Sequence, residues 1–160
     1  MGSEMCIRDR APAPTWPTWA LLATIGAWVA VIDAITTWIP AALAWTGWAG
    51  WIGAVVVTAL SDQTAAIRAV IATAIIFAAW MIAWLISRGG FGFSDVRITP
   101  LWAAPAAATG IDTIQVTVIA GLTLIALYAL IDRFRHHTTR FLPWAPSLCS
   151  GALVGLAIAH

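Results

Sequence analysis

Long apolar runs, each almost free of charge, constrain this chain more than any other feature of its sequence. Four of them cover residues 19–37, 39–60, 65–86 and 114–131. A helix needs roughly 20 mostly apolar residues to cross a bilayer, so each of these runs predicts one span. A run over 98–108, interrupted by Pro100 and Pro105, predicts a partial or tilted helix. A final run begins near Pro146 and reaches His160. We therefore expect an all-α, polytopic integral membrane helical bundle with about six transmembrane helices.

The composition agrees with a lipid environment. Hydrophobic residues make up 61% of the chain and charged residues only 9%, whereas a soluble domain carries about 25% charged residues. A single soluble core cannot hide this much apolar surface, so the lipid bilayer is the expected partner. No basic stripe with interleaved aromatic residues is present, which argues against nucleic-acid binding.

The cysteines and histidines do not predict a metal site. Cys6 and Cys149 lie at opposite ends of the chain, and Cys149 reads as a small buried hydrophobe. The adjacent His136 and His137 lack cysteine or carboxylate neighbours at ligand spacing. We expect no metal and no cofactor.

The N-terminal segment differs from the rest of the chain. Residues 1–10 hold four of the fifteen Asp, Glu and Arg residues and no apolar run, so we interpret them as non-native. Residues 11–18 form a Pro-rich lead-in that we expect to stay outside a regular helix. The membrane domain is then predicted over 19–160. Its last run is short for a span, and we expect the natural chain to continue beyond it.

The arginines predict an orientation. With residues 1–10 set aside, alternating six spans places five arginines on one side of the membrane, namely Arg88, Arg97, Arg133, Arg135 and Arg140, and leaves only Arg68 on the other. By the positive-inside rule the first side is cytoplasmic. In this topology Asp33 and Asp95 both lie at cytoplasmic helix ends, while Asp62 and Asp112 lie on the outer side.

Asp33 stands inside an apolar run, AWVAVIDAITTWIP. An ionisable residue in a membrane segment is costly and suggests a functional site. The alternative is a carboxylate at a helix end that reaches headgroup water or pairs with an arginine. Position alone favours neither reading.

Asp95 follows a glycine-rich segment, RGGFGFSDVR. The glycines predict a break in the helix and a close approach of the backbone to another group. Irregular backbone at membrane depth is tolerated only where protein or water surrounds it. A solvated aspartate in an ordinary cytoplasmic loop explains the segment equally well.

The two aspartates as a pair indicate a functional site more strongly than either aspartate does alone. Two carboxyl groups at helix ends on one membrane face can meet across the bundle, and two close carboxyl groups share a proton. The ionised one then takes a proton from water, and the protonated one donates to a scissile carbonyl. This is the chemistry of an aspartyl protease.

Three segments resemble the type IV prepilin peptidases and preflagellin peptidases, a family of GxGD-type membrane aspartyl proteases. The first runs from Asp33 to Pro40 (DAITTWIP) and is similar to the family's aspartate followed by an Ile-Pro pair. The second runs from Gly90 to Arg97 (GFGFSDVR), and the third from Leu142 to Ala152 (LPWAPSLCSGA). The similarity covers about residues 20–155 and corresponds to short family members without the N-terminal CxxC region. Methyltransferase activity is therefore not expected.

The resemblance implies catalytic roles for Asp33 and Asp95. It implies cleavage of the basic leader of a pilin-like precursor at the cytoplasmic face of a prokaryotic plasma membrane. Gly90, Gly92 and Ser94 would shape the loop that presents Asp95, while Pro40, Pro143 and Pro146 would shape the helices around the site.

The chain departs from the family pattern at Ser94, which replaces a glycine. A positive φ at that position would cost energy for serine. This departure keeps open a catalytically inactive relative that binds a pilin-like helix or an assembly partner. A small proton-coupled transporter is a further alternative. The oligomeric state is not predicted.

Overall fold

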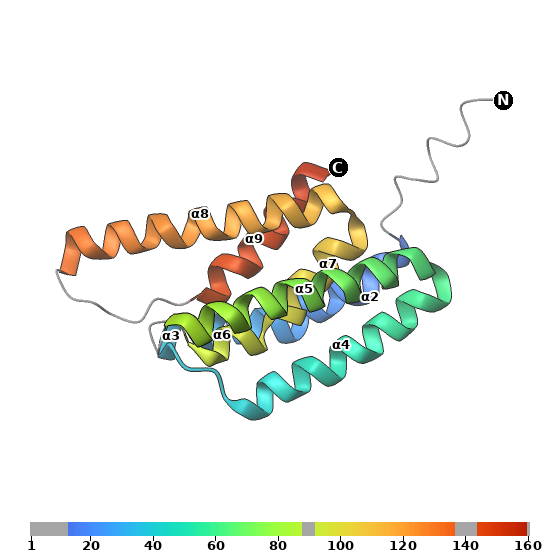
Figure 1. Ribbon diagram of the computed structural model, residues 1–160, viewed down its shortest axis with the longest axis horizontal. Helices are drawn as coiled ribbons and strands as arrows, with labels where there is room; N and C mark the ends of the chain where they lie inside the picture. The colour runs from blue at the N-terminus through green and yellow to red at the C-terminus, as the bar shows by residue number, and fades with distance from the viewer. Residues whose placement is uncertain (1–12, 88–91, 137–143, 160) are drawn as a thin grey trace.

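The computed structural model describes residues 13–87, 92–136 and 144–159, and all regular secondary structure in these residues is helical (Figure 1). The elements, in chain order, are η1 (Ala13–Thr15), α2 (Trp16–Leu21), the π-helical turn η2 (Leu22–Gly26), α3 (Ala27–Thr36), α4 (Ala41–Ser61), α5 (Gln63–Ser87), α6 (Phe93–Arg97), α7 (Thr99–Thr109), α8 (Ile111–His136) and α9 (Trp144–Ala159).

Four helical segments are long and apolar enough to cross a membrane. They are Trp16–Thr36, which joins α2, η2 and α3, then Ala41–Ser61, Gln63–Ser87 and Ile111–Phe134. The helical fold and the four full spans agree with the sequence prediction. The predicted count of about six spans is not confirmed, because α7 has 11 residues and α9 has 16.

Helix α7 is the centre of the bundle rather than a lipid-facing span. Nearly all of its residues are buried, including Leu101 and Trp102. It contacts α2, α4, α5, α8 and α9. At a rise of about 1.5 Å per residue, a helix of this length covers only part of the hydrocarbon thickness.

The expectation that residues 11–18 stay outside a regular helix is wrong for its last three positions. Helix α2 begins at Trp16, and Pro17 lies in its first turn. Proline is tolerated there because the first amides of a helix have no acceptor within the helix. The sequence therefore places the start of the first span three residues too late.

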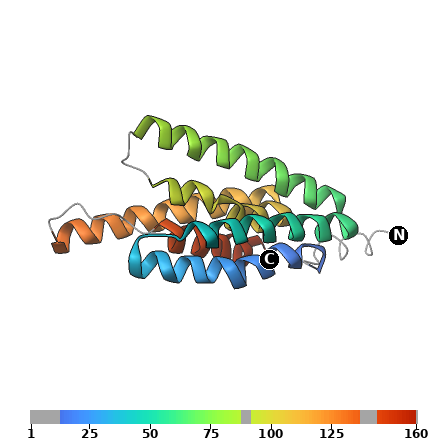
Figure 2. The ribbon, with the colours of Figure 1, turned by 90° about the horizontal axis from the view of Figure 1, so that it is seen from below.

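The helix ends gather at two opposite ends of the bundle (Figures 1 and 2). Helices α3 and α5 end near the starts of α4 and α6, α9 begins beside the end of α3, and α8 extends beyond them on the same side. We call this the aspartate end, because Asp33 and Asp95 both lie there. The α4–α5 turn and the α7–α8 junction lie at the other end.

The charged residues follow this division as the sequence predicts. Arg97 and Arg133 lie toward the aspartate end, and Asp62, Arg68 and Asp112 lie toward the other. Arg88 and Arg140 fall outside the described residues.

Two of these charged side chains cap helices at the end opposite the aspartates. The Asp62 carboxylate accepts a hydrogen bond from the amide of Ala65 in the first turn of α5, at 2.9 Å. The guanidinium of Arg68 donates to the carbonyl of Ala108 near the end of α7, at 3.0 Å. Both bonds satisfy backbone groups that a helix terminus leaves unpaired, so these residues have structural roles.

Helices α8 and α9 form the closest pair in the fold. A Cβ added to Gly151 would lie 2.6 Å from the Thr117 carbonyl oxygen and 2.7 Å from the Gly121 nitrogen. Gly155 is packed in the same way against Thr113 and Thr117. Small residues, among them Gly121 and Gly151, thus let the two backbones approach. This contact holds α9 against α8 and thereby positions the first amides of α9.

Candidate active site

Asp33 lies in the last full turn of α3 and points into the bundle. Its side chain is only 3% exposed, whereas Ile35, two residues later, is 78% exposed. Its Oδ2 accepts a hydrogen bond from the amide of Ala145 at 3.0 Å, and the amide of Trp144 donates to the same carboxyl group. Asp33 therefore meets the N-terminus of α9, 112 residues along the chain. It is buried within protein, unlike the headgroup-facing carboxylate that position alone also allowed.

The chain leaves α3 through a strained residue. Thr37 has φ 53° and ψ 24°, in the left-handed region, and its amide donates to the Asp33 carbonyl at 2.8 Å. A β-branched residue rarely adopts this conformation, because its Cβ crowds the backbone. Pro40 directly precedes α4, and its carbonyl accepts hydrogen bonds from the amides of Leu43 and Ala44. This tight turn sets α4 beside the end of α3.

Asp95 lies in α6, a helix of five residues, and is 6% exposed. Its amide donates to the Gly92 carbonyl at 3.1 Å, which closes the first turn of α6. Gly92 has φ −72°, a conformation open to any residue. An added Cβ at Gly92 would lie 2.9 Å from Asp95 Oδ2, so a larger residue there would displace the Asp95 carboxyl group. The close approach predicted for the glycine-rich segment is thus made by Gly92 to the Asp95 carboxyl group itself.

The strain expected at Ser94 does not arise. Ser94 lies inside α6, and among the described residues only Thr37 combines a side chain with a positive φ. The serine therefore fits the backbone without conformational cost.

The structure brings Asp33 and Asp95 into electrostatic contact. Burial, and to a smaller extent the negative charge of Asp33, together raise the pKa of Asp95 from its ordinary 3.8 to about 7. Two carboxyl groups perturb each other in this way only when they are close and poorly hydrated.

The three segments of the resemblance converge on this pair. Ile39, Ile98 and Ala145 belong to one buried apolar cluster. Ile39 follows Asp33, Ile98 follows Asp95, and Ala145 lies in the first turn of α9. Residues within or directly after the three segments, more than 40 residues apart in the chain, thus belong to one apolar cluster at the aspartate end.

The remaining predicted site residues have mixed outcomes. Pro146 is the third residue of α9 and half-buried. Gly90 and Pro143 lie outside the described residues.

Three groups near the site were not anticipated from the sequence. The amide of Ala145 binds Asp33, but a backbone donor has no signature in sequence. The indole of Trp48 donates to the Arg97 carbonyl at 3.0 Å. Phe93 lies between Trp84, at 5.0 Å between ring centroids, and the guanidinium of Arg97, at 5.2 Å from its ring. None of these contacts is indicated by a periodicity or a motif in the sequence.

No cluster of three His, Cys, Asp or Glu side chains suited to a metal occurs within the described ranges. Cys149 is buried beside Leu148 and Ala152 in an apolar cluster, which confirms its prediction as a small hydrophobe.

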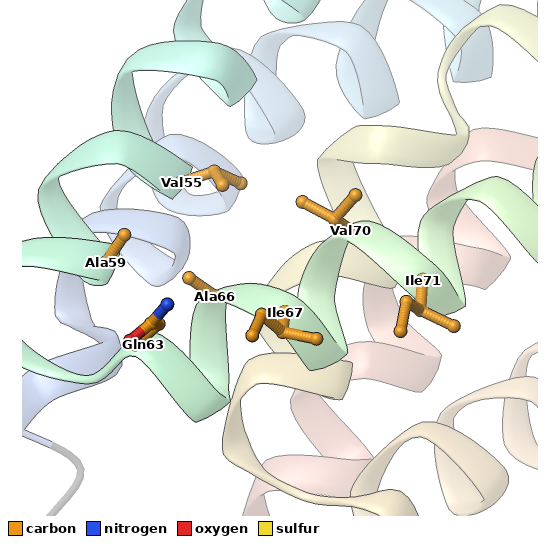
Figure 3. A pocket seen from close by; sticks show the side chains of 7 residues that line it. All are labelled: Val55, Ala59, Gln63, Ala66, Ile67, Val70 and Ile71. Atoms are coloured by element: carbon orange, nitrogen blue, oxygen red, sulfur yellow. The ribbon is translucent and has the colours of Figure 1, made fainter.

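A groove lies between α4 and α5, well away from the aspartates (Figure 3). Its volume is about 320 Å³, and it is lined by Val55, Ala59, Gln63, Ala66, Ile67, Val70 and Ile71. Gln63 supplies its only polar side chain, and no lining residue is ionisable. The groove therefore offers no acid, base or nucleophile.

Comparisons with models of known protein families, with curated proteins and with solved structures found no match for this chain.

Proposed function

We propose that this protein is a membrane aspartyl endopeptidase in which Asp33 and Asp95 activate water for attack on a peptide bond. The observation that carries the proposal is the buried pair of electrostatically coupled carboxyl groups. Such a pair holds one proton at neutral pH, which supplies a base and an acid at the same site.

The surroundings of the two carboxyl groups favour different roles. Asp33 faces the first amides of α9, where hydrogen bonds and the helix dipole stabilise a negative charge. The pKa of Asp95, raised to about 7, keeps it protonated over much of the neutral range. We therefore assign the base that deprotonates water to Asp33, and the acid that protonates the carbonyl oxygen to Asp95.

The expected substrate is a pilin-like precursor, cleaved before its hydrophobic helix to remove a basic leader. This substrate rests on the resemblance of the three sequence segments to the prepilin peptidases. Their packing around one carboxyl pair adds support, as does the absence of strain at Ser94. The expected location is a prokaryotic plasma membrane, with the aspartate end toward the cytoplasm.

Co-expression with pilin-like precursors from the same organism tests the proposal. The parent, Asp33→Asn, Asp95→Asn and a control, Asp112→Asn, are compared by precursor size on a gel and by mass spectrometry of the product N-terminus. Asp112 is exposed at the opposite end of the bundle, so its variant should cleave like the parent. Cleavage by the parent and the control alone supports the proposal. If a folded parent leaves every precursor intact, the inactive-relative alternative replaces it.

A further inference from the structure

Helix α6 needs support from outside itself, because it is too short to be stable alone. It has five residues, and an isolated helix shorter than about 12 residues is marginal in water. Its last carbonyls have no partner within the helix. The Thr99 hydroxyl at the start of α7 binds one of them, the Val96 carbonyl, at 2.8 Å. The position of the Asp95 carboxyl group also depends on what binds the carbonyl at the end of α6, that of Arg97.

The carbonyl of Arg97, the last residue of α6, is bound by a side chain from another helix. The indole Nε1 of Trp48, in α4, donates to it at 3.0 Å. The amide of Leu101 would donate to Arg97 if the helix continued regularly, but it donates to the Ile98 carbonyl instead, at 3.0 Å. Trp48 thus takes the place of the missing helical donor.

The indole that makes this bond is itself held in place. The ring of Trp48 packs edge-on against Trp51, with centroids 5.4 Å apart and planes at 76°. It also packs edge-on against Phe77 of α5, at 5.5 Å and 89°. Edge-to-face aromatic pairs prefer such distances and fix ring orientation. The direction of the indole N–H is therefore set by α4 and α5 together.

We propose that Trp48 is a positioning residue, whose indole N–H holds the end of α6 and thereby aligns the carboxyl group of Asp95 with that of Asp33. Its effect on catalysis rests on the proposed protease function. The hydrogen bond to Arg97 does not, and it is measured separately below.

Trp51 provides a matched control on the same helix. Its indole nitrogen is buried and has no hydrogen-bond partner in the part of the chain that the structure describes. Trp48→Phe and Trp51→Phe remove the same atoms from neighbouring positions in one aromatic cluster, but only the first removes a hydrogen bond to α6.

The first readout is precursor cleavage by the full-length protein in detergent or liposomes. Misplacing a catalytic group by about 1 Å lowers rates up to about a hundredfold. We expect Trp48→Phe to lower kcat about tenfold or more with KM unchanged, and to shift the pH at which activity is half-maximal. Trp51→Phe keeps an aromatic ring at position 51 and leaves the Trp48 hydrogen bond in place, so it should lower kcat clearly less than Trp48→Phe does. Equal kcat values and pH profiles for the two variants would overturn the positioning role.

The second readout is hydrogen exchange of the α6 amides, which needs no substrate. Trp48→Phe should speed exchange over residues 93–98 relative to both the parent and Trp51→Phe. Equal exchange in the two variants would overturn the link between Trp48 and α6. If the parent cleaves no precursor while Trp48→Phe alone exchanges faster, the link is supported and the proposed protease function fails.

Should Trp48→Phe not fold, benzothienylalanine in place of Trp48 keeps the bicyclic shape and replaces only the N–H with sulfur. The same two readouts and the same outcomes then apply.

Discussion

Replacing Asp95 with asparagine should make the protein more stable at neutral pH while removing its proposed activity. The unfolded chain loses the Asp95 proton near its ordinary pKa of 3.8, whereas the folded protein keeps it up to about pH 7. Between these pH values the folded state binds the extra proton, so its stability falls as pH rises. Because asparagine cannot ionise, the Asp95→Asn variant does not lose this stability as pH rises.

The size of the effect follows from the pKa. It lies about 3 pH units above the ordinary value, and each unit corresponds to about 1.36 kcal/mol. The stability gained by Asp95→Asn should therefore grow by up to ~4 kcal/mol between pH 4 and pH 7, then level off. For a chain of this size, that gain raises the unfolding midpoint by on the order of 10 °C.

Thermal unfolding in a mild detergent, followed by tryptophan fluorescence at pH 4 to 8.5, measures this difference. Subtracting the parent's unfolding midpoint from the variant's at each pH removes the contribution of every group that titrates alike in both proteins. Asp112→Asn, at an exposed position on the opposite end, is the control and should track the parent at every pH. Parallel curves for Asp95→Asn and the parent would refute the claim that Asp95 is buried with a raised pKa.

Four other substitutions test the packing and the backbone. Gly151→Ala should lower the unfolding midpoint, because its Cβ would meet the Thr117 carbonyl at 2.6 Å. Gly53→Ala, with nothing within 4 Å of the added Cβ, should instead gain about 1 kcal/mol of helix propensity, and a loss of stability there would contradict the packing. Thr37→Gly should stabilise the fold by about 1 kcal/mol by relieving the left-handed strain, measured as a raised midpoint. Thr58→Val should be neutral or stabilising, because the buried Thr58 hydroxyl has no partner among the described residues. A clear loss of stability would indicate a partner for it.

The helices could be predicted from the sequence because membrane spans depend on local composition. The four full spans are recovered within a few residues of their observed ends. The core position of helix α7 was harder to predict, because a short apolar run has the same composition whether lipid or protein surrounds it. Only its burial and its packing against the surrounding helices, among them α2, α4, α5, α8 and α9, identify it as a core helix.

The two candidate site residues could be predicted from the sequence, but their arrangement in space could not. Asp33 and Asp95 stand out because carboxyl groups are rare in this apolar chain. Their meeting depends on α9, whose first amides bind Asp33, and on Trp48, whose indole binds the end of α6. Backbone donors and long-range side-chain contacts have no periodicity or motif, so neither could be read from the chain.

Cleavage kinetics of the purified protein test the central claim most directly. The parent, Asp33→Asn, Asp95→Asn and the double variant are reconstituted in liposomes with a pilin-like precursor. If the two carboxyl groups act as one unit, each single variant should lose on the order of a thousandfold in kcat, and the double variant should lose no more. Substantial cleavage by either single variant, or losses that multiply in the double variant, would contradict a shared two-aspartate mechanism.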